Sequence, residues 1–263
     1  RTETSFGARL VTWTCNYAAL SHVGRLRDRN EDYWNAEVDL GLYVVADGMG
    51  GHLAGDLAAR SVAEALPSLV EQRLQGTESL TNSSATALVT QCICELSNYM
   101  FERAHNEPGL DGIGATVVLA LVREDGAILA HMGDSRAYLF RQGSLRRVTT
   151  DHSIVQLLIE NGEISPEDAK QHPSRGQLTR FVGMESEPLP SAQFLELRDQ
   201  DRLLLCTDGL TDLIQDERIQ AYFRGQDELE SLCQCFIDAA NVARGRDYVT
   251  ALVVSISDSE STA

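Results

Sequence analysis

The chain has 263 residues, of which 43% are hydrophobic and 23% are charged, and these are the proportions of a folded globular protein rather than of a disordered, collagen-like or coiled-coil chain. Lys and Arg number 22 against 39 Asp and Glu, so the formal net charge is −17. That charge repels nucleic-acid phosphates and anionic membrane surfaces, and no apolar run approaches the ~20 residues that span a bilayer. We therefore expect no nucleic-acid binding and no membrane insertion.

The six cysteines predict neither a disulfide framework nor a zinc site. Cys92 and Cys94, like Cys233 and Cys235, are separated by one residue within helical patterns, where the two thiols point to different faces. No C-x-x-C spacing with a nearby histidine is present. Residues 1–10 also lack the pattern of a signal peptide. We expect reduced thiols, a cytoplasmic location and a monomer.

The first half of the chain predicts two strands followed by two long helices. Residues 16–21 and 42–46 are predicted strands, the second apolar enough to be buried on both faces. Apolar residues at helical spacing predict a helix over 53–74, with Pro67 kinking or splitting it. A second helix is predicted over 84–105.

The second half returns to strands. Glycine-containing turns at 124–126 and 141–144 predict hairpins and therefore antiparallel pairing. This pattern favours an α+β fold with antiparallel sheets, formed by residues 1–263 as one domain. The predicted strands are 115–122, 127–132, 137–141, 194–197, 202–206 and 249–256, and the predicted helices are 153–160, 166–171 and 227–243.

Four aspartates share a position next to a buried strand. Asp47, Asp134 and Asp208 each follow an apolar strand beside a glycine or turn, and Asp247 stands just before the last strand. Any one of them alone is most often a turn residue. Four together, with residues 30–32 near a further strand end, predict an all-oxygen site of the kind that Mg²⁺ or Mn²⁺ prefers. A metal-dependent hydrolase is therefore plausible from placement alone.

Seven short motifs follow one another over most of the chain, from about residue 20 to 255. They are residues 21–32 (SHVGRLRDRNED), 47–51 (DGMGG), 114–116 (GAT), 133–136 (GDSR), 151–153 (DHS), 207–210 (TDGL) and 247–250 (DYVT). Each is weak alone, but in this order and spacing they closely resemble the bacterial branch of the protein phosphatase 2C (PPM, metal-dependent protein phosphatase) family.

The resemblance implies a four-layer α-β-β-α sandwich of two antiparallel sheets flanked by helix pairs, with metals in a cleft at one end. It further implies a serine/threonine phosphatase that hydrolyses phosphoserine and phosphothreonine in proteins. A binuclear Mn²⁺ or Mg²⁺ centre would activate the attacking water, and a third, weaker ion is possible. Phosphorylated proteins and a cognate Ser/Thr kinase pathway are the implied partners.

The resemblance also implies the metal ligands. Asp47 matches the carboxylate that bridges the two metals, and the carbonyl of Gly48 adds a ligand. Asp208 and Asp247 match ligands of one metal, and Glu31 matches a carboxylate that serves the other, directly or through water. No Ser, Cys or His nucleophile is required in this scheme.

Two further carboxylates have implied roles around these ligands. Asp32 matches an acceptor behind the metals that orients metal-bound water. Asp134 matches the residue that, with the one matching Asp208, binds the third metal. The alternative for Asp134 is a capping partner for Arg136.

Arg27 matches the phosphate-binding arginine of the family, whose planar fork can take two phosphoryl oxygens. The alternative is a solvated strand face, because Arg25, Arg27 and Arg29 alternate as outward residues would. The spacing of four residues before Glu31 favours Arg27 as the functional arginine.

The chain departs from the family pattern at two positions. Met49 stands where some members carry a histidine assigned as general acid, and a thioether cannot donate a proton. Metal-bound water or another group must then protonate the leaving alkoxide, and His152 is expected to be structural. Tyr248 stands where many members have asparagine, and a tyrosine there alters the contacts around Asp247.

Residues 160–188 correspond to the flap beside the cleft in this family. His172, Arg175 and Arg180 of the flap either meet a phosphopeptide or are ordinary surface residues, and the surface reading is favoured.

Two alternatives to a protein phosphatase stay open from sequence. One is a non-catalytic phosphoprotein-binding scaffold of the same fold, which would have lost metal aspartates; none is missing here. The other is a hydrolase of small phosphoesters, which the sequence cannot separate from a protein phosphatase.

Overall fold

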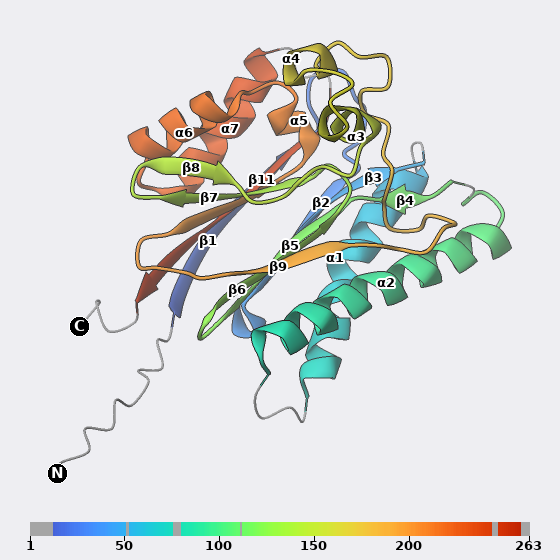
Figure 1. Cartoon of the computed structure of the whole chain (residues 1–263), viewed down its shortest axis with the longest axis horizontal. Coiled ribbons are helices and arrows are strands. Elements are labelled where there is room, and N and C mark those ends of the chain that lie inside the picture. Colours follow the sequence, from blue (N-terminus) through green and yellow to red (C-terminus); the bar gives the residue numbers. More distant parts are fainter. Residues whose placement is uncertain (1–12, 51–52, 76–79, 111, 244–246, 259–263) are drawn as a thin grey trace.

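Two antiparallel sheets lie face to face in the centre of the structure, and helices cover their outer faces (Figure 1). The structure is a computed structural model that describes residues 13–50, 53–75, 80–110, 112–243 and 247–258. Gly51 of the DGMGG motif lies outside the described residues, as do residues 1–12 and 259–263 of the expected domain.

The first sheet joins the beginning of the described chain to its end. Its order is β1-β11-β10-β7-β8, and every neighbouring pair is antiparallel. β1 and β11 pair along their whole length, from Trp13 opposite Asp258 to His22 opposite Val249. The strands are β1 (Trp13–His22), β7 (Arg136–Arg141), β8 (Ser144–Arg147), β10 (Arg202–Cys206) and β11 (Val249–Asp258).

The second sheet has the order β2-β3-β5-β6-β9, with β4 paired to the end of β3. The predicted hairpin turn at 124–126 joins β5 to β6, and the turn at 141–144 joins β7 to β8 in the other sheet. The strands are β2 (Asp32–Glu37), β3 (Leu42–Met49), β4 (Gly114–Ala115), β5 (Val117–Arg123), β6 (Gly126–Met132) and β9 (Ser191–Leu195), with the 3-10 turn η1 (Val38–Leu40) between β2 and β3.

Helices pack on the outer face of each sheet. α1 (Leu53–Leu74) and α2 (Asn82–Asn106) cover the second sheet, and α6 (Asp216–Gly225) and α7 (Leu229–Val242) cover the first (Figure 1). The short helix α3 (Ile154–Glu160) leads into the expected flap region, α4 (Pro166–Ala169) lies within it, and α5 (Asp208–Thr211) begins two residues after β10. The predicted α+β, four-layer sandwich is therefore confirmed.

The alternation of side chains explains why the strands are apolar on both faces. Along β3, Leu42, Val44 and Ala46 pack toward the helices, while Tyr43 and Val45 pack between the sheets. Burying both faces requires an unbroken apolar run, as the sequence of this strand predicts. Three apolar layers result: helix on sheet, sheet on sheet, and sheet on helix.

Several local expectations need correction. Pro67 neither breaks nor ends α1, which runs as a single helix from Leu53 to Leu74. Residues 23–31 form a loop rather than a strand, so the alternation of Arg25, Arg27 and Arg29 does not mark a strand face. β2, β8, α5 and α6 were not predicted as elements. No helix among the described residues is long and apolar enough to cross a membrane.

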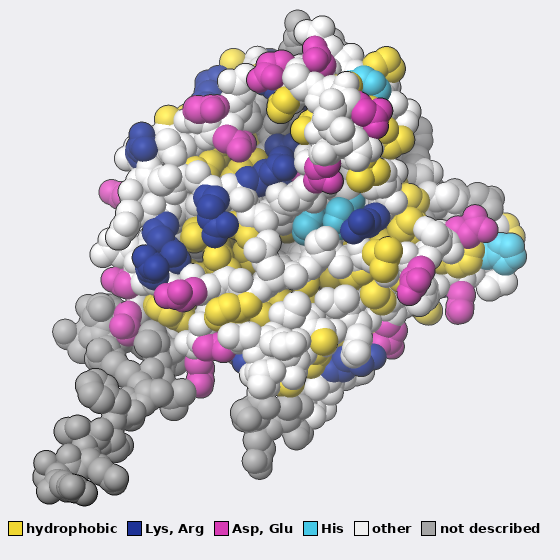
Figure 2. Space-filling model, viewed as in Figure 1, with side chains coloured by type: hydrophobic (Ala, Val, Ile, Leu, Met, Phe, Trp, Pro, Cys, Tyr) yellow, Lys and Arg dark blue, Asp and Glu magenta, His cyan; other side chains and the backbone are white. Residues whose placement is uncertain are grey.

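Charged side chains are interspersed over the face seen in Figure 2, with acidic and basic groups both represented. The excess of acidic residues is therefore not gathered into one block on this face. The acidic groups that matter for chemistry lie in the cleft described next.

Candidate metal centre

A cavity of about 670 Å³ opens where the ends of β3, β6 and β10 meet the beginning of β11. It is lined by carboxylate side chains from segments of both sheets and by two arginines, Arg27 and Arg29. Seven of the eight residues expected at the site line it: Arg27, Glu31, Asp47, Gly48, Asp134, Asp208 and Asp247. The fold thus brings together groups that are up to 220 residues apart in the sequence.

Asp32, the eighth expected residue, lies behind the cavity. Its side chain is buried, with 4% of its surface exposed. The hydroxyls of Thr207 and Thr250 donate hydrogen bonds to its Oδ2 atom, at 2.9 and 2.8 Å. Its Oδ1 atom has no hydrogen-bond partner among the described residues. The carboxylate therefore has an acceptor oxygen to spare for a group in the site.

The same threonines connect the two sheets. Thr207 directly follows β10 and Thr250 belongs to β11, two neighbouring strands of the first sheet, whereas Asp32 begins β2 in the second. The Thr207 hydroxyl also accepts a hydrogen bond from the Thr250 backbone N–H, at 3.0 Å. In the second sheet, the Asp47 N–H donates to the hydroxyl of Thr116, at 3.0 Å. These bonds fix the strand ends that carry the carboxylates.

The carboxylates disturb one another electrostatically. Burial in the cleft raises the pKa of Asp47 well above its ordinary value, and the charges of Asp32, Asp208 and Asp134 raise it further. The pKa of Asp208 is raised well above its usual range for the same two reasons. Burial also raises the pKa of Asp32 and that of Asp134 to about 7 each.

Glycines allow the loops around the cavity to approach closely. A Cβ atom at Gly48 would collide with the carbonyl oxygen of Gly55, near the start of α1, and a Cβ at Gly55 would collide with Oε2 of Glu31. The Gly48 N–H donates to the carbonyl oxygen of Glu31, at 3.0 Å. Glu31, Gly48 and α1 are therefore closely packed: a Cβ at Gly48 would meet backbone atoms, whereas a Cβ at Gly55 would first meet the end of the Glu31 side chain.

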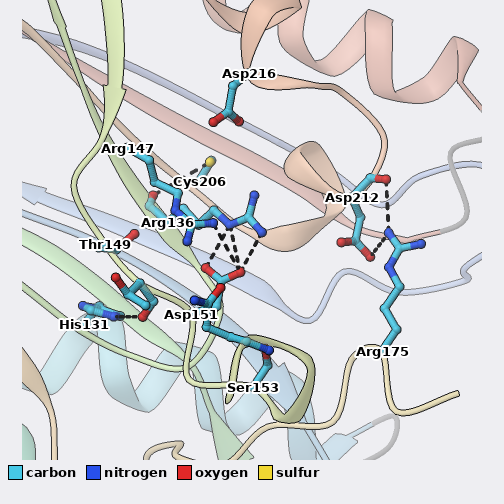
Figure 3. Close-up of polar contacts among 12 residues, drawn as sticks. His131, Arg136, Arg147, Thr149, Asp151, Ser153, Arg175, Cys206, Asp212 and Asp216 are labelled. Carbon is cyan, nitrogen blue, oxygen red and sulfur yellow. Dashed lines mark hydrogen bonds and ion pairs between the residues drawn. The ribbon is translucent and has the colours of Figure 1, made fainter. Parts of the chain in front are cut away.

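Arg136, in the GDSR motif, is anchored away from the cavity. Its guanidinium donates to the carboxylate of Asp151 with nitrogen–oxygen distances of 2.6 to 3.2 Å (Figure 3). The expected alternative, in which Asp134 serves as the partner of Arg136, is therefore wrong. Asp151 takes that role, and Asp134 is left facing the cavity.

His152 is structural, as expected. Its Nδ1 atom accepts a hydrogen bond from the Gly133 N–H at 3.3 Å, and its Nε2 atom lies 2.9 Å from the Ser191 hydroxyl. Its ring stacks on that of His131, with centroids 4.5 Å apart. Burial, followed by the charges of His131 and Arg180, lowers its pKa to about 3, so the ring is neutral.

The flap residues make local contacts. Arg175 pairs with the carboxylate of Asp212 at 2.8 Å and donates to the carbonyl oxygen of the same residue, at 3.2 Å (Figure 3). Arg180 approaches His152 and the carbonyl oxygen of Leu189. The Nδ1 atom of His172 accepts from the N–H of Ser174. These contacts are all with neighbouring parts of the protein, in agreement with the favoured reading of the three as ordinary surface residues.

The donor set fits a hard divalent cation. Most of the oxygen donors among the side chains that line the cavity are carboxylates, and their mutual repulsion would be relieved by a bound cation. As the side chains stand, however, no three His, Cys, Asp or Glu among the described residues converge into a ready-made metal site. Asp247 is turned to Arg27, with 3.2 Å between Oδ1 and Nη2.

The comparisons with known proteins agree with this geometry. The protein phosphatase 2C family matches residues 22–244. The chain belongs to the protein phosphatase 2C family. A serine/threonine phosphatase, stp, from Listeria monocytogenes is 34% identical over 234 residues, which cover 88% of this chain and 92% of that protein.

Solved structures of this family share the fold. The serine/threonine phosphatase PstP/Ppp of Mycobacterium tuberculosis is 35% identical, with a TM-score of 0.80, and the match covers 92% of this chain and 99% of that one. A PstP catalytic domain in complex with two manganese ions is 34% identical, with a TM-score of 0.78, covering 94% and 100%. The expected family, fold and enzyme class, a protein phosphatase, are confirmed.

Some residues around this protein phosphatase 2C site were missed by sequence reasoning. Asp212 lies close enough to Asp134 and Asp208 for its charge to raise the pKa of both. Thr207 and Thr250 hold Asp32 from the other sheet. The two threonines belong to the TDGL and DYVT motifs, and their position next to the metal aspartates in the sequence could have indicated their role. Asp212 lies in none of the motifs, so no sequence pattern indicated its role.

Proposed function

We propose that this member of the protein phosphatase 2C family hydrolyses phosphoserine and phosphothreonine in proteins, with Mn²⁺ or Mg²⁺ held in the carboxylate-lined cavity. Glu31, Asp47, Gly48, Asp208 and Asp247 hold the catalytic pair of ions, and Asp134 with Asp208 holds a third. One observation carries the proposal: carboxylates from separate strand ends of both sheets line one cavity and raise each other's pKa.

The ions, when bound, lower the pKa of a water molecule and so supply a nucleophile at neutral pH. The protein's own groups do the rest. Arg27 takes phosphoryl oxygens through its planar fork, as its position on the cavity wall supports. Asp32 accepts a proton or hydrogen bond from the attacking water through the Oδ1 atom that lacks a described partner.

The leaving alkoxide takes its proton from water. Met49 lines the cavity but carries no proton to give, and no histidine lines the cavity among the described residues. His152 is held neutral by burial and engaged in hydrogen bonds. The six cysteines are free thiols. Burial raises the pKa of Cys15 and of Cys206, and a raised pKa disfavours the thiolate that a cysteine nucleophile needs.

The partners follow from this chemistry. Phosphorylated proteins are the substrates, and a Ser/Thr kinase acting on them is opposed by this enzyme. The relatives that bear serine/threonine phosphatase names support this substrate class. We place the enzyme in the cytoplasm, which its free cysteines support, and expect it to act as a monomer. Residues 1–263 form one catalytic domain, with a flap at 160–188 that borders the cavity through Gly176 and Leu178.

The test is phosphate release from a phosphothreonine peptide with Mn²⁺ and with EDTA. We expect turnover in Mn²⁺ and none in EDTA. A matched Asp47→Asn variant should be inactive in both conditions. Hydrolysis of p-nitrophenyl phosphate without hydrolysis of any phosphopeptide or phosphoprotein would favour a small-phosphoester hydrolase. Tight phosphopeptide binding without turnover in Mn²⁺ would favour a scaffold, and full activity after metal stripping would contradict the whole proposal.

A further inference from the structure

Tyr248 is a large aromatic residue set into the wall of the cavity, directly after Asp247. Only 7% of its surface is exposed, yet it lines the cavity. Its backbone is also fixed, because a Cβ atom at Gly209 would collide with the carbonyl oxygen of Tyr248. Gly209 follows Asp208 in α5, so the helix that begins with one proposed metal ligand packs closely against Tyr248, the residue after another ligand, Asp247. The ring therefore has a defined position relative to the metal site.

Arg27, by contrast, lies in a loop without regular structure, and about half of its side chain is exposed. Two contacts of its guanidinium are described. One is the ion pair with Asp247, at 3.2 and 3.4 Å. The other is with Tyr248, whose ring centroid lies 5.1 Å from the guanidinium carbon. A long side chain on such a loop has many rotamers, so these two contacts determine the position of the guanidinium.

The two contacts are not equivalent. Asp247 is a proposed metal ligand, so a cation in the site competes with Arg27 for its negative charge. The Tyr248 ring is neutral and attracts the guanidinium through its face, which a cation bound to Asp247 does not replace. A guanidinium that lies over a ring keeps its in-plane N–H groups free for two phosphoryl oxygens.

We propose that Tyr248 is a positioning residue for phosphate recognition: its ring holds the Arg27 guanidinium over the cavity, ready for the phosphoryl group. This inference rests on the proposed role of Arg27 in binding phosphate. The ligand chemistry is that of a phosphate monoester dianion, and the ring acts on it only through Arg27.

A second contact of Tyr248 must be separated from the first. Its hydroxyl lies near the carboxylate of Glu31, another proposed metal ligand, and the pKa of the phenol is raised by burial first and then by that carboxylate. Tyr248→Phe removes the hydroxyl and keeps the ring, whereas Tyr248→Leu removes both. A change in phosphate binding that appears in the leucine variant alone belongs to the ring. A change in Mn²⁺ affinity that appears in both belongs to the hydroxyl.

The experiment measures KM and kcat on a phosphothreonine peptide at saturating Mn²⁺, together with calorimetric titrations of inorganic phosphate and of Mn²⁺. For Tyr248→Leu we expect KM and the phosphate Kd to rise by the same factor of about two to five, the range given by one cation–π contact at a partly exposed site. For Tyr248→Phe both should stay near wild type. In an Arg27→Ala background, Tyr248→Leu should cause no further rise.

Three outcomes would overturn the inference. They are an unchanged KM and phosphate Kd in Tyr248→Leu, an equal rise in Tyr248→Phe, or the same factor in the Arg27→Ala background. If Arg27→Ala itself changes neither KM nor phosphate Kd, the proposed role of Arg27 fails instead. Thermal melting confirms that each variant is folded, and Tyr248→Met, which also lacks a ring, replaces Tyr248→Leu if the latter is not.

Discussion

Asp32 and Asp47 lie directly opposite one another in the β2–β3 ladder. Neighbouring antiparallel strands place such a pair of side chains on the same face of the sheet, within about 5.5 Å at Cβ. Like charges in that position destabilise a sheet, and burial makes the pair more costly still. The backbone ladder therefore holds two carboxylates together against their own repulsion, which is the arrangement that a cation site requires.

Removing one negative charge from the carboxylate cluster should greatly reduce catalysis without reducing the stability of the fold. Asp208→Asn keeps the size of the side chain, so we expect the fold to survive and the metal-free melting temperature to stay equal or rise slightly. Phosphopeptide turnover should fall by orders of magnitude, because a ligand of the catalytic ions is lost. Asp134→Asn should weaken the main metal pair less.

Calorimetric Mn²⁺ titration and phosphopeptide kinetics check this comparison. Asp227→Asn is the control, since that side chain is fully exposed and does not line the cavity. Near-normal turnover of Asp208→Asn, with two tightly bound ions, would show that this carboxylate is not a ligand.

Metal removal should lower stability as well as activity. A ligand that binds only the folded state stabilises it by RT ln(1 + [L]/Kd), about 2.7 kcal/mol at a hundredfold excess over Kd. We therefore expect the melting temperature to rise steadily with Mn²⁺ concentration and to return to the metal-free value with EDTA. Differential scanning calorimetry at several Mn²⁺ concentrations tests this. A melting temperature that ignores Mn²⁺ would contradict binding in the folded state.

Gly55→Ala should disturb the site without unfolding the protein. The added Cβ collides with the end of the Glu31 side chain, which can swing away at little structural cost. We expect weaker Mn²⁺ binding and a drop in turnover, with melting within a few degrees of wild type. Gly225→Ala is the matched control, because a Cβ there meets no atom within 4 Å. Unchanged Mn²⁺ affinity in Gly55→Ala would mean that the position of Glu31 is unimportant.

His152 should make the protein sensitive to acid. Its pKa is lowered from 6.5 to about 3 in the folded state, first by burial, so unfolding takes up a proton at intermediate pH. The stability that it contributes is present above pH 6.5 and is lost as the pH falls toward 3. Between neutrality and pH 5 the loss is about 2 kcal/mol, at ~1.4 kcal/mol per pH unit.

Urea denaturation of metal-free protein at pH 7.5 and pH 5 measures this loss. His152→Gln should show about 2 kcal/mol less pH dependence than wild type, since it cannot be protonated. The same substitution at the exposed His105 should change nothing. Equal pH dependence of wild type and His152→Gln would exclude a neutral buried ring.

The Arg175–Asp212 ion pair ties the flap to the segment that follows Asp208. Both side chains are about 40% exposed, so the pair contributes at most ~1 kcal/mol and the fold should not depend on it. Arg175→Ala should raise KM for a phosphopeptide by no more than about five-fold, while p-nitrophenyl phosphate, which is too small to need the flap, is hydrolysed normally. Arg198→Ala, at another exposed ion pair, is the control. Equal effects on both substrates would contradict a role for the flap.

The sequence predicts the carboxylate positions well because each depends on local pattern. An apolar strand with an aspartate at one end, beside a glycine or a turn, is visible in a few residues, and those strand ends do converge on the cavity. β2 was missed because its sequence, DYWNAE, lacks an apolar run, and α6 because Ile219 and Phe223 are its only buried residues.

The contacts between distant segments could not be predicted. Arg175 and Asp212 are 37 residues apart, and no periodicity connects a flap to a short helix. The hydrogen bonds from Thr207 and Thr250 to Asp32 require knowing which sheet each strand joins. The contact between Arg27 and the Tyr248 ring could not be predicted either. The sequence shows a tyrosine where many family members have asparagine, and only the fold shows that it contacts Arg27.

Because β1, the first described strand, pairs with β11, the last, the site can form only late in the synthesis of the chain. Asp247 lies two residues before β11, and β11 lies between β1 and β10, the strand that leads to Asp208. A growing chain still attached to the ribosome cannot complete this sheet until β11 has left the exit tunnel. All strands of the second sheet, which carries Asp47, precede β11 in the chain, but the cavity also needs the carboxylates of the first sheet. Hydrolysis by a nascent chain is thus withheld until nearly all of the described residues have been made.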